Sequence, residues 1–317
     1  MAQALKRTCM ILRYWSITLI CTLFAFSLPA TSGAMAIDAE QQYRFAETLF
    51  DSHQYRRAAE EYQRFAFFFP DDPRQRQSRF KAGQAFLLAE DPETALTLFN
   101  ELTDLMPLDS VAIESYFMMV ECHLSLHAVT QAVVDLNNLI TLSDDRSVRN
   151  RAYNRLGWLY IDQTDWAAAQ TAFARISADQ RSWYHVDGLE RDLNDSSRLP
   201  ARSPALAGAL SIIPGAGQLY CNRYEDALIA FIVNAGLIWA THDAFDEEQY
   251  GLGGLLSFVA LGFYAGNIYS AVADAHKYNQ FQKQKFRDEL KRHLVPGPST
   301  EQFTVRTRML LSLRVPF

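Results

Sequence analysis

The sequence predicts an all-α protein in which a helical solenoid is followed by a helical transmembrane hairpin. Two observations lead to this fold. Over about residues 38–181, small residues recur at a fixed interval of 37 positions, at Ala58, Ala95, Ala132 and Ala169. Beyond residue 203, uncharged stretches follow one another, and the longest is long enough to cross a bilayer as a helix.

Other positions share this interval. Large apolar residues follow the alanines by four positions, and small residues or valine precede them by twelve: Tyr62, Phe99, Leu136 and Phe173, and Ala46, Gly83, Val120 and Gly157. Pro70 and Pro107 follow the first two alanines by twelve positions. The pattern resembles the tetratricopeptide repeat, a helix–turn–helix unit normally of 34 residues. This resemblance implies four repeats and a capping helix over residues 37–193, with the third repeat matching least well.

The first helix of each repeat is predicted to line a groove that binds a protein or peptide partner. Two rows of residues would point into it: Tyr43, Phe80, Phe117 and Asn154, and Glu47, Gln84, Glu121 and Trp158. The rows are aromatic and mildly acidic, so we expect an extended apolar or basic segment held by aromatic anchors. The alternative is that several of these rings only pack one repeat against the next.

Nothing in the repeats predicts catalysis, a metal site or a cofactor. His123 and His127 are four residues apart and could share a helix face, but no third metal ligand is evident. Residues 182–187 include Ser, His and Asp, yet hydrolytic triads are assembled from distant segments. The formal net charge is −6, and no basic patch interleaved with aromatics occurs in the repeats. We therefore expect neither an enzyme nor a nucleic-acid partner.

Residues 1–36 have the order of a secretory signal peptide. Lys6, Arg7 and Arg13 precede an apolar run at 14–28, and Ala34-Met35-Ala36 fits a small-residue cleavage site. An uncleaved anchor helix is the alternative. Either segment would send the repeats across a membrane, so we expect a bacterial cell-envelope protein, anchored in a membrane, with its repeats in the periplasm.

A Ser-, Arg-, Asp- and Pro-rich linker at 194–204 separates the repeats from an apolar module at 205–273. The module begins with a short motif made by Pro214, Gly215, Gly217, Gln218 and Tyr220. This motif resembles the pattern P-G-x-G-Q-x-Y of a family of small two-helix membrane modules, although Asn222 stands where that family usually has glycine. The resemblance covers residues 204–278 and implies a membrane hairpin without an enzymatic activity.

Transmembrane helices are expected at about residues 225–243 and 250–273. The stretch 203–222 is broken by the proline and glycines of the motif, which leaves two or three spans and their sidedness open. Gly262 and Gly266 form a G-x-x-x-G face at which another helix, in this chain or a second copy, could approach closely. Asn234 would seek a hydrogen bond across helices. A soluble hydrophobic helical domain is the alternative.

Residues 274–317 predict a charged helix to about Leu294 and then an alternating stretch, 303–317, that ends in Phe317. This stretch is either a closing strand of the kind found in outer-membrane barrels, an edge strand or a loose tail. Taken together, these features predict a non-catalytic adaptor that holds a protein partner in the periplasm and contacts membrane lipid, in envelope assembly or scaffolding. The competing prediction is a small helical channel or transport component, which would need charges inside its spans.

Overall fold

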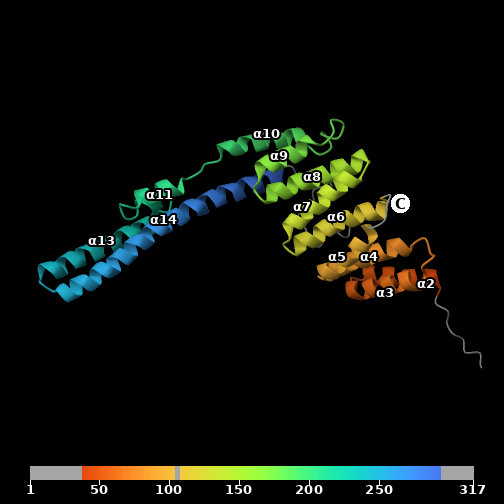
Figure 1. Ribbon diagram of the computed structural model, residues 1–317, viewed down its shortest axis with the longest axis horizontal. Helices are drawn as coiled ribbons and strands as arrows, with labels where there is room; N and C mark the ends of the chain where they lie inside the picture. Colours follow the sequence, from red (N-terminus) through yellow and green to blue (C-terminus); the bar gives the residue numbers. More distant parts are fainter. Residues whose placement is uncertain (1–37, 104–107, 294–317) are drawn as a thin grey trace, which may run out of the picture.

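The computed structural model describes residues 38–103 and 108–293, and every regular element in these ranges is helical. Helices α2 to α9 form four successive pairs, each helix packed on the next one in the chain, and an apolar hairpin extends away from them (Figure 1). The prediction of an all-α solenoid followed by a hairpin is confirmed. The solenoid helices are α2 (Ala39–Asp51), α3 (Tyr55–Phe68), α4 (Gln75–Leu88), α5 (Pro92–Thr103), α6 (Ser110–Ser125), α7 (Val129–Leu142), α8 (Arg146–Asp162) and α9 (Trp166–Ala174).

The interval of 37 residues is visible in the backbone itself. The turn inside each pair contains one non-glycine residue in the left-handed region, with φ between 58° and 61°. These residues are His53, Glu90, His127 and Thr164, and the second helix of each pair starts two residues after each of them. Because the same turn recurs at the same interval, the second helices stack in a regular series.

Aspartates start several of these helices. Asp38, Asp109, Asp145 and Asp165 each accept a hydrogen bond from a backbone N–H in the first turn of the following helix. This is the favoured use of aspartate at a helix N-terminus, where backbone donors have no partner within the helix. It explains why acidic turn residues recur between the apolar stretches.

Small residues allow the two helices of a pair to approach closely. A Cβ atom on Gly83 would lie 2.7 Å from the ring of Phe99, and one on Gly157 would lie 2.5 Å from the ring of Phe173. Both rings are fully buried, as are the four alanines that mark the interval. Each glycine therefore provides the space that the aromatic ring of the next helix occupies.

The last pair is closed by two further helices. α10 (Val186–Asn194) buries Leu189 and Leu193 against Phe173, as expected of a capping helix. The C-terminal end of α14 (Tyr250–His293) joins the same cluster, where Leu290 is 2 % exposed. In Figure 1 the blue end of α14 returns to α8, α9 and α10 after running the length of the hairpin.

The apolar module starts with two short helices on the side of α14. α11 (Pro204–Leu210) and α12 (Ala216–Tyr220) are separated by the predicted Pro-Gly break, and both pack on α14. Neither is long enough to cross a bilayer. Within the described residues, two helices are long and apolar enough to do so, α13 (Tyr224–Asp246) and α14.

The apolar surface of these two helices faces outward. Only 11 % of the most apolar window of each helix is buried inside the protein. Trp239 and Phe258, for example, are 75 % and 77 % exposed. A helix from a soluble core would hide such residues, so this surface indicates association with a membrane.

α14 also extends well beyond the predicted span. It has 44 residues, about 66 Å at a rise of 1.5 Å per residue, whereas a bilayer core is about 30 Å thick. The predicted span at 250–273 and the charged helix that follows it are one continuous helix. The predicted signal peptide, Pro107 and the alternating stretch that ends at Phe317 lie outside the described residues.

Candidate partner-binding surface

The first helices of the pairs (α2, α4, α6 and α8) carry the eight residues predicted to line a partner groove, on what we call the first-helix face. The structure places Tyr43, Phe80, Phe117 and Trp158 in the interior, each more than nine-tenths buried. Tyr43 packs edge-on against Phe65, with ring centroids 5.1 Å apart. The expectation that these rings stand free as anchors is therefore not met, because they fill the space between neighbouring helices.

Cationic side chains cover two of these rings. The guanidinium of Arg74 and the ammonium of Lys81 lie 4.9 Å and 5.3 Å from the centre of the Tyr43 ring. The guanidinium of Arg151 lies 3.8 Å from the centre of the Phe117 ring. Such stacking is favourable because the face of an aromatic ring is electron-rich. The surface that a partner would meet at these positions is consequently charged.

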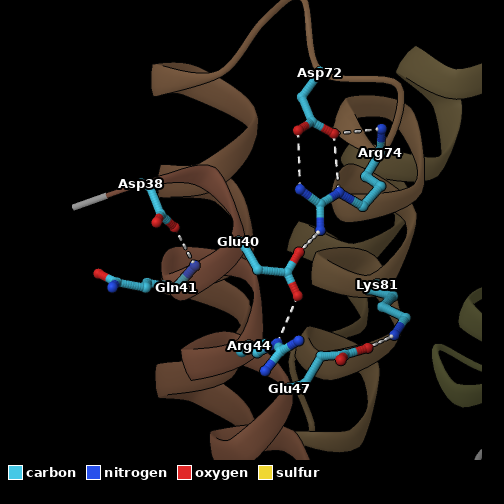
Figure 2. A network of polar contacts seen from close by, with 8 residues as sticks. All are labelled: Asp38, Glu40, Gln41, Arg44, Glu47, Asp72, Arg74 and Lys81. Carbon is cyan, nitrogen blue, oxygen red and sulfur yellow. Dashed lines mark hydrogen bonds and ion pairs between the residues drawn. The ribbon is translucent and has the colours of Figure 1, made fainter.

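Each of these cations also bonds to a carboxylate of the preceding repeat, as Figure 2 shows for α2 and α4. Arg74 lies between two acids, 2.6 Å from Glu40 Oε2 and 3.0 Å from Asp72 Oδ2. Lys81 Nζ is 2.6 Å from Glu47 Oε1. The network ties the first turn of α2 to the connection that leads into α4.

The same arrangement recurs two repeats later. Arg155 bonds to Glu121 and Arg151 bonds to Glu114, joining α8 to α6. Glu47 and Lys81 are each 74 residues before their counterparts Glu121 and Arg155. The equivalent positions between the second and third repeats hold Gln84 and Met118, both buried. We call the ion pairs that join α2 to α4 and those that join α6 to α8 the two charged joints. Between α4 and α6 the equivalent position is uncharged, and these helices are joined instead by Arg76, whose Nε lies 3.1 Å from Oδ2 of Asp109 at the start of α6.

Neighbouring charges shift the pKa values of two of these groups, Glu40 and Lys81, in the directions that favour their charged forms. Hydrogen bonds from Arg74 and Arg44 hold the pKa of Glu40 below its usual range. Burial lowers the pKa of Lys81, but the Glu47 carboxylate and Tyr43 outweigh burial, so its pKa is raised. These shifts favour the charged forms of Glu40 and Lys81.

The accessible part of the predicted rows is polar. The side chains of Glu47 and Glu121 are 42 % and 30 % exposed, and Asn154 is partly exposed. Gln84, the remaining member, is 7 % exposed. Carboxylates at this spacing could exchange their intramolecular partners for the basic side chains of an extended segment.

His123 lies in a different environment from a metal ligand. Its Nε2 is 3.3 Å from Asp135 Oδ2, across the α6–α7 pair. Burial lowers the pKa of His123 and raises the pKa of Asp135 to about 6. Among the described residues, no group of three or more His, Cys, Asp and Glu side chains is arranged to hold a metal ion.

Sequence reasoning missed one exposed feature of the solenoid. Phe67 and Phe68, at the end of α3, are 76 % and 63 % exposed, and their rings lie edge-to-face with centroids 5.2 Å apart. The signal was available in the run Phe65–Phe69, which has more aromatic rings than one helix face can bury. Exposed aromatic pairs of this kind are common at protein interfaces.

The residues of the predicted motif in the membrane module hold α12 against α14. Gly215 has φ of +86°, and a Cβ there would lie 2.3 Å from the carbonyl oxygen of Ala227. Gln218 is buried and donates from Nε2 to Asn267 O and Oδ1, each at 3.0 Å. Asn267 in turn donates to the carbonyl of Ser211 at 3.1 Å. Only glycine fits the turn, and the paired amides hold it against α14.

The remaining residues of the motif continue this contact. Pro214 immediately precedes the left-handed glycine and is partly exposed. Gly217 permits a close approach of α12 to α11 and α14, since a Cβ there would lie 2.3 Å from Ala207 O and 2.6 Å from Ala271 Cβ. The Tyr220 hydroxyl accepts a hydrogen bond from the backbone of Ser203 at 3.2 Å, and Arg202 stacks on the Tyr220 ring at 4.8 Å. These contacts fix the start of the module onto its last helix.

Asn234 has another hydrogen-bond partner than expected, and the two glycines of the G-x-x-x-G face meet no other helix of the described chain. Asn234 donates to the carbonyl of Ala230 in its own helix at 2.8 Å, rather than across helices. No atom of the described chain lies within 4 Å of a Cβ built on Gly262 or Gly266, so the G-x-x-x-G face is open within this chain. Close packing occurs instead at Gly217, where α11, α12 and α14 meet.

No family model matches this chain, and none of the curated proteins compared with it is similar enough to match. The resemblances to tetratricopeptide repeats and to two-helix membrane modules therefore rest on the residues described above.

Proposed function

We propose that the chain is a non-catalytic adaptor anchored in a membrane, whose solenoid binds a protein partner in the periplasm during envelope assembly or scaffolding. The repeats are of the tetratricopeptide type in this proposal. A solenoid of helix pairs offers a long surface to a partner. An apolar hairpin at its end supplies the anchor.

The observation that best supports this proposal is that α14 belongs to both the hairpin and the last repeat. One helix runs from the apolar hairpin into the core of the last repeat, where Phe286 packs edge-to-face on Trp166 with centroids 5.2 Å apart. Lys291 forms an ion pair with Asp162 of α8. A flexible tether would need none of these contacts. A fixed connection supports a solenoid held at a set distance from the membrane.

The partner is proposed to be an extended segment with basic side chains, bound across the first-helix face. Glu47 and Glu121 are partly exposed carboxylates at equivalent positions of the two charged joints, where basic side chains of the segment would meet them. Charge complementarity of this kind sets partner choice and the rate of association.

Photo-crosslinking in living cells tests this proposal. A photoreactive residue at Gln77, on the first-helix face between the two joints, should capture one protein. The double variant Glu47→Gln with Glu121→Gln should abolish capture while leaving the chain in the membrane fraction. The control Glu60→Gln with Glu101→Gln removes the same charge from the second helices and should capture normally. Capture that survives the first pair of substitutions would show that the partner binds elsewhere.

A further inference from the structure

A groove between α13 and α14 remains open in the middle of the hairpin. It encloses about 760 Å³ and is polar at the end near the solenoid and apolar towards the tip of the hairpin. Near the tip the helices close, since a Cβ on Gly253 would lie 2.9 Å from the Phe245 ring. Around Gly262 and Gly266 the two helices are not in close contact, because no described atom lies within 4 Å of a Cβ built on either glycine.

The groove as a whole has the length of an extended acyl chain. Phe258 and Asp274, at its two ends on α14, are about 24 Å apart along the helix at a rise of 1.5 Å per residue. Ile229 and Val233 line the opposite wall on α13. A slot of this kind facing hydrocarbon loses dispersion contacts unless a chain fills it.

The polar end contains two hydrogen-bond acceptors without a donor. Asp274 is 4 % exposed and Gln218 is 1 % exposed, and both line the groove. Neither Asp274 Oδ2 nor Gln218 Oε1 has a hydrogen-bond partner among the described residues. Buried acceptors without partners are costly. An occupant that offers N–H or O–H groups would satisfy both acceptors.

The rim of the polar end has one acid and one base on each helix. Arg223 Nη2 lies 2.5 Å from Asp226 Oδ2 on α13, and Lys277 Nζ lies 3.5 Å from Asp274 Oδ1 on α14. The side chains of Arg223 and Lys277 are 52 % and 66 % exposed, so both cations remain accessible. A headgroup that carries both an anion and a cation matches this rim.

We propose that this groove binds phosphatidylethanolamine. Its primary ammonium donates to the acceptors at Asp274 and Gln218, and its phosphate lies between Arg223 and Lys277. One acyl chain runs along Gly262 and Gly266. The proposal concerns the hairpin alone and holds whatever the solenoid binds.

A series of lipids that differ only in the methylation of the amine tests this proposal. The full chain is placed in nanodiscs of phosphatidylglycerol, and binding of phosphatidylethanolamine and its mono-, di- and trimethylated forms is measured by native mass spectrometry. The net charge is constant through the series, while the number of N–H donors falls to zero. Affinity should fall at each step, by about tenfold in total. Equal affinity across the series would overturn the proposal.

Substitutions then locate the site. Gly262→Leu should fill the slot, and Asp274→Asn should remove the charged acceptor, so each should abolish the preference for the primary amine. Gly254→Leu is the matched control: Gly254 is on the same helix, has the same open surroundings and does not line the groove. A preference retained in Gly262→Leu contradicts the proposal. The proposal is also contradicted if the chain forms a dimer that Gly262→Leu dissociates whatever the lipid headgroup. In that case a second copy of the chain, and not a lipid, occupies the slot.

Discussion

Single glycines and aromatic rings determine how closely the helices of a pair approach. At Gly157 the neighbouring Phe173 ring is fully buried and has no room to move away from an added methyl group. We expect Gly157→Ala to lower the free energy of unfolding by about 1–3 kcal/mol, the usual cost of overpacking a core. Chemical unfolding of the full chain in nanodiscs, followed by tryptophan fluorescence, measures this change.

Gly188 provides the control for that substitution. It is in α10, and nothing lies within 4 Å of a Cβ built on it. Gly188→Ala should therefore stabilise the protein by up to about 1 kcal/mol, because alanine favours a helix over glycine. An equal effect of the two substitutions would show that Gly157 does not lie at a close helix approach.

Asp135 predicts a pH dependence of stability. Burial raises the pKa of this carboxyl from its ordinary value near 3.8 to about 6. A group whose folded pKa is raised stabilises the protein fully below the unfolded pKa, and that contribution is lost as pH rises through the folded value. Asp135→Asn should therefore exceed the natural chain in unfolding free energy by about 3 kcal/mol at pH 7 and by little at pH 4.

Unfolding curves at pH 4, 5, 6 and 7 check this prediction. Asp144→Asn, at an exposed position between α7 and α8, is the matched control and should leave the pH profile of the natural chain unchanged. A constant difference between Asp135→Asn and the natural chain over this range would contradict a raised pKa at Asp135.

The predicted groove residues show how far sequence reasoning extends at the scale of one residue. The interval places Tyr43, Phe80 and Phe117 at equivalent positions, and the structure keeps them equivalent. Whether a ring is exposed, however, depends on which side chain of the next repeat lies over it. Arg74 and Arg151 cover Tyr43 and Phe117 from 31 and 34 positions away. The periodicity of a single helix does not reveal which side chain of the next repeat lies over a given ring.

At the scale of elements, the repeat interval predicted the helix pairs because it acts locally. The turn at His53, Glu90, His127 and Thr164 follows from residues within a few positions of it. The hairpin was predictable for the same reason, from uninterrupted apolar stretches. The packing of α11 and α12 on α14 was not predictable from the sequence. Gln218 and Asn267 are 49 positions apart, and either could have formed a hydrogen bond elsewhere.

The hairpin predicts where labels become accessible. Asp246 is at the end of α13, beside the turn into α14, and Lys283 is exposed on α14 beyond the apolar part. If α13 and α14 both cross the membrane, Asp246→Cys and Lys283→Cys must lie on opposite sides. A membrane-impermeant maleimide applied to sealed vesicles should label one variant before lysis and the other only after it. Labelling of both from the same side would contradict a spanning hairpin.

At the scale of the whole molecule, α14 connects the hairpin to the solenoid, and the proposed adaptor needs this connection to be rigid. Its contact with the last repeat joins Leu290 to Ile161 and Phe173, residues more than a hundred positions earlier in the chain. The sequence predicted a charged helix to about Leu294 after the span but gave no sign of which residues the end of that helix would contact. Only the three-dimensional path of α14 brings Phe286 to Trp166.

The distance between the solenoid and the hairpin tests this rigid connection most directly. Spin labels at Thr171→Cys in α9 and Tyr269→Cys in α14, both exposed positions, are introduced into a chain whose own cysteines are replaced by alanine. Pulsed electron paramagnetic resonance in nanodiscs should give one narrow distance distribution, which Leu290→Asp broadens. A broad distribution in the chain that keeps Leu290 would contradict the account, because the solenoid would then move freely relative to its anchor.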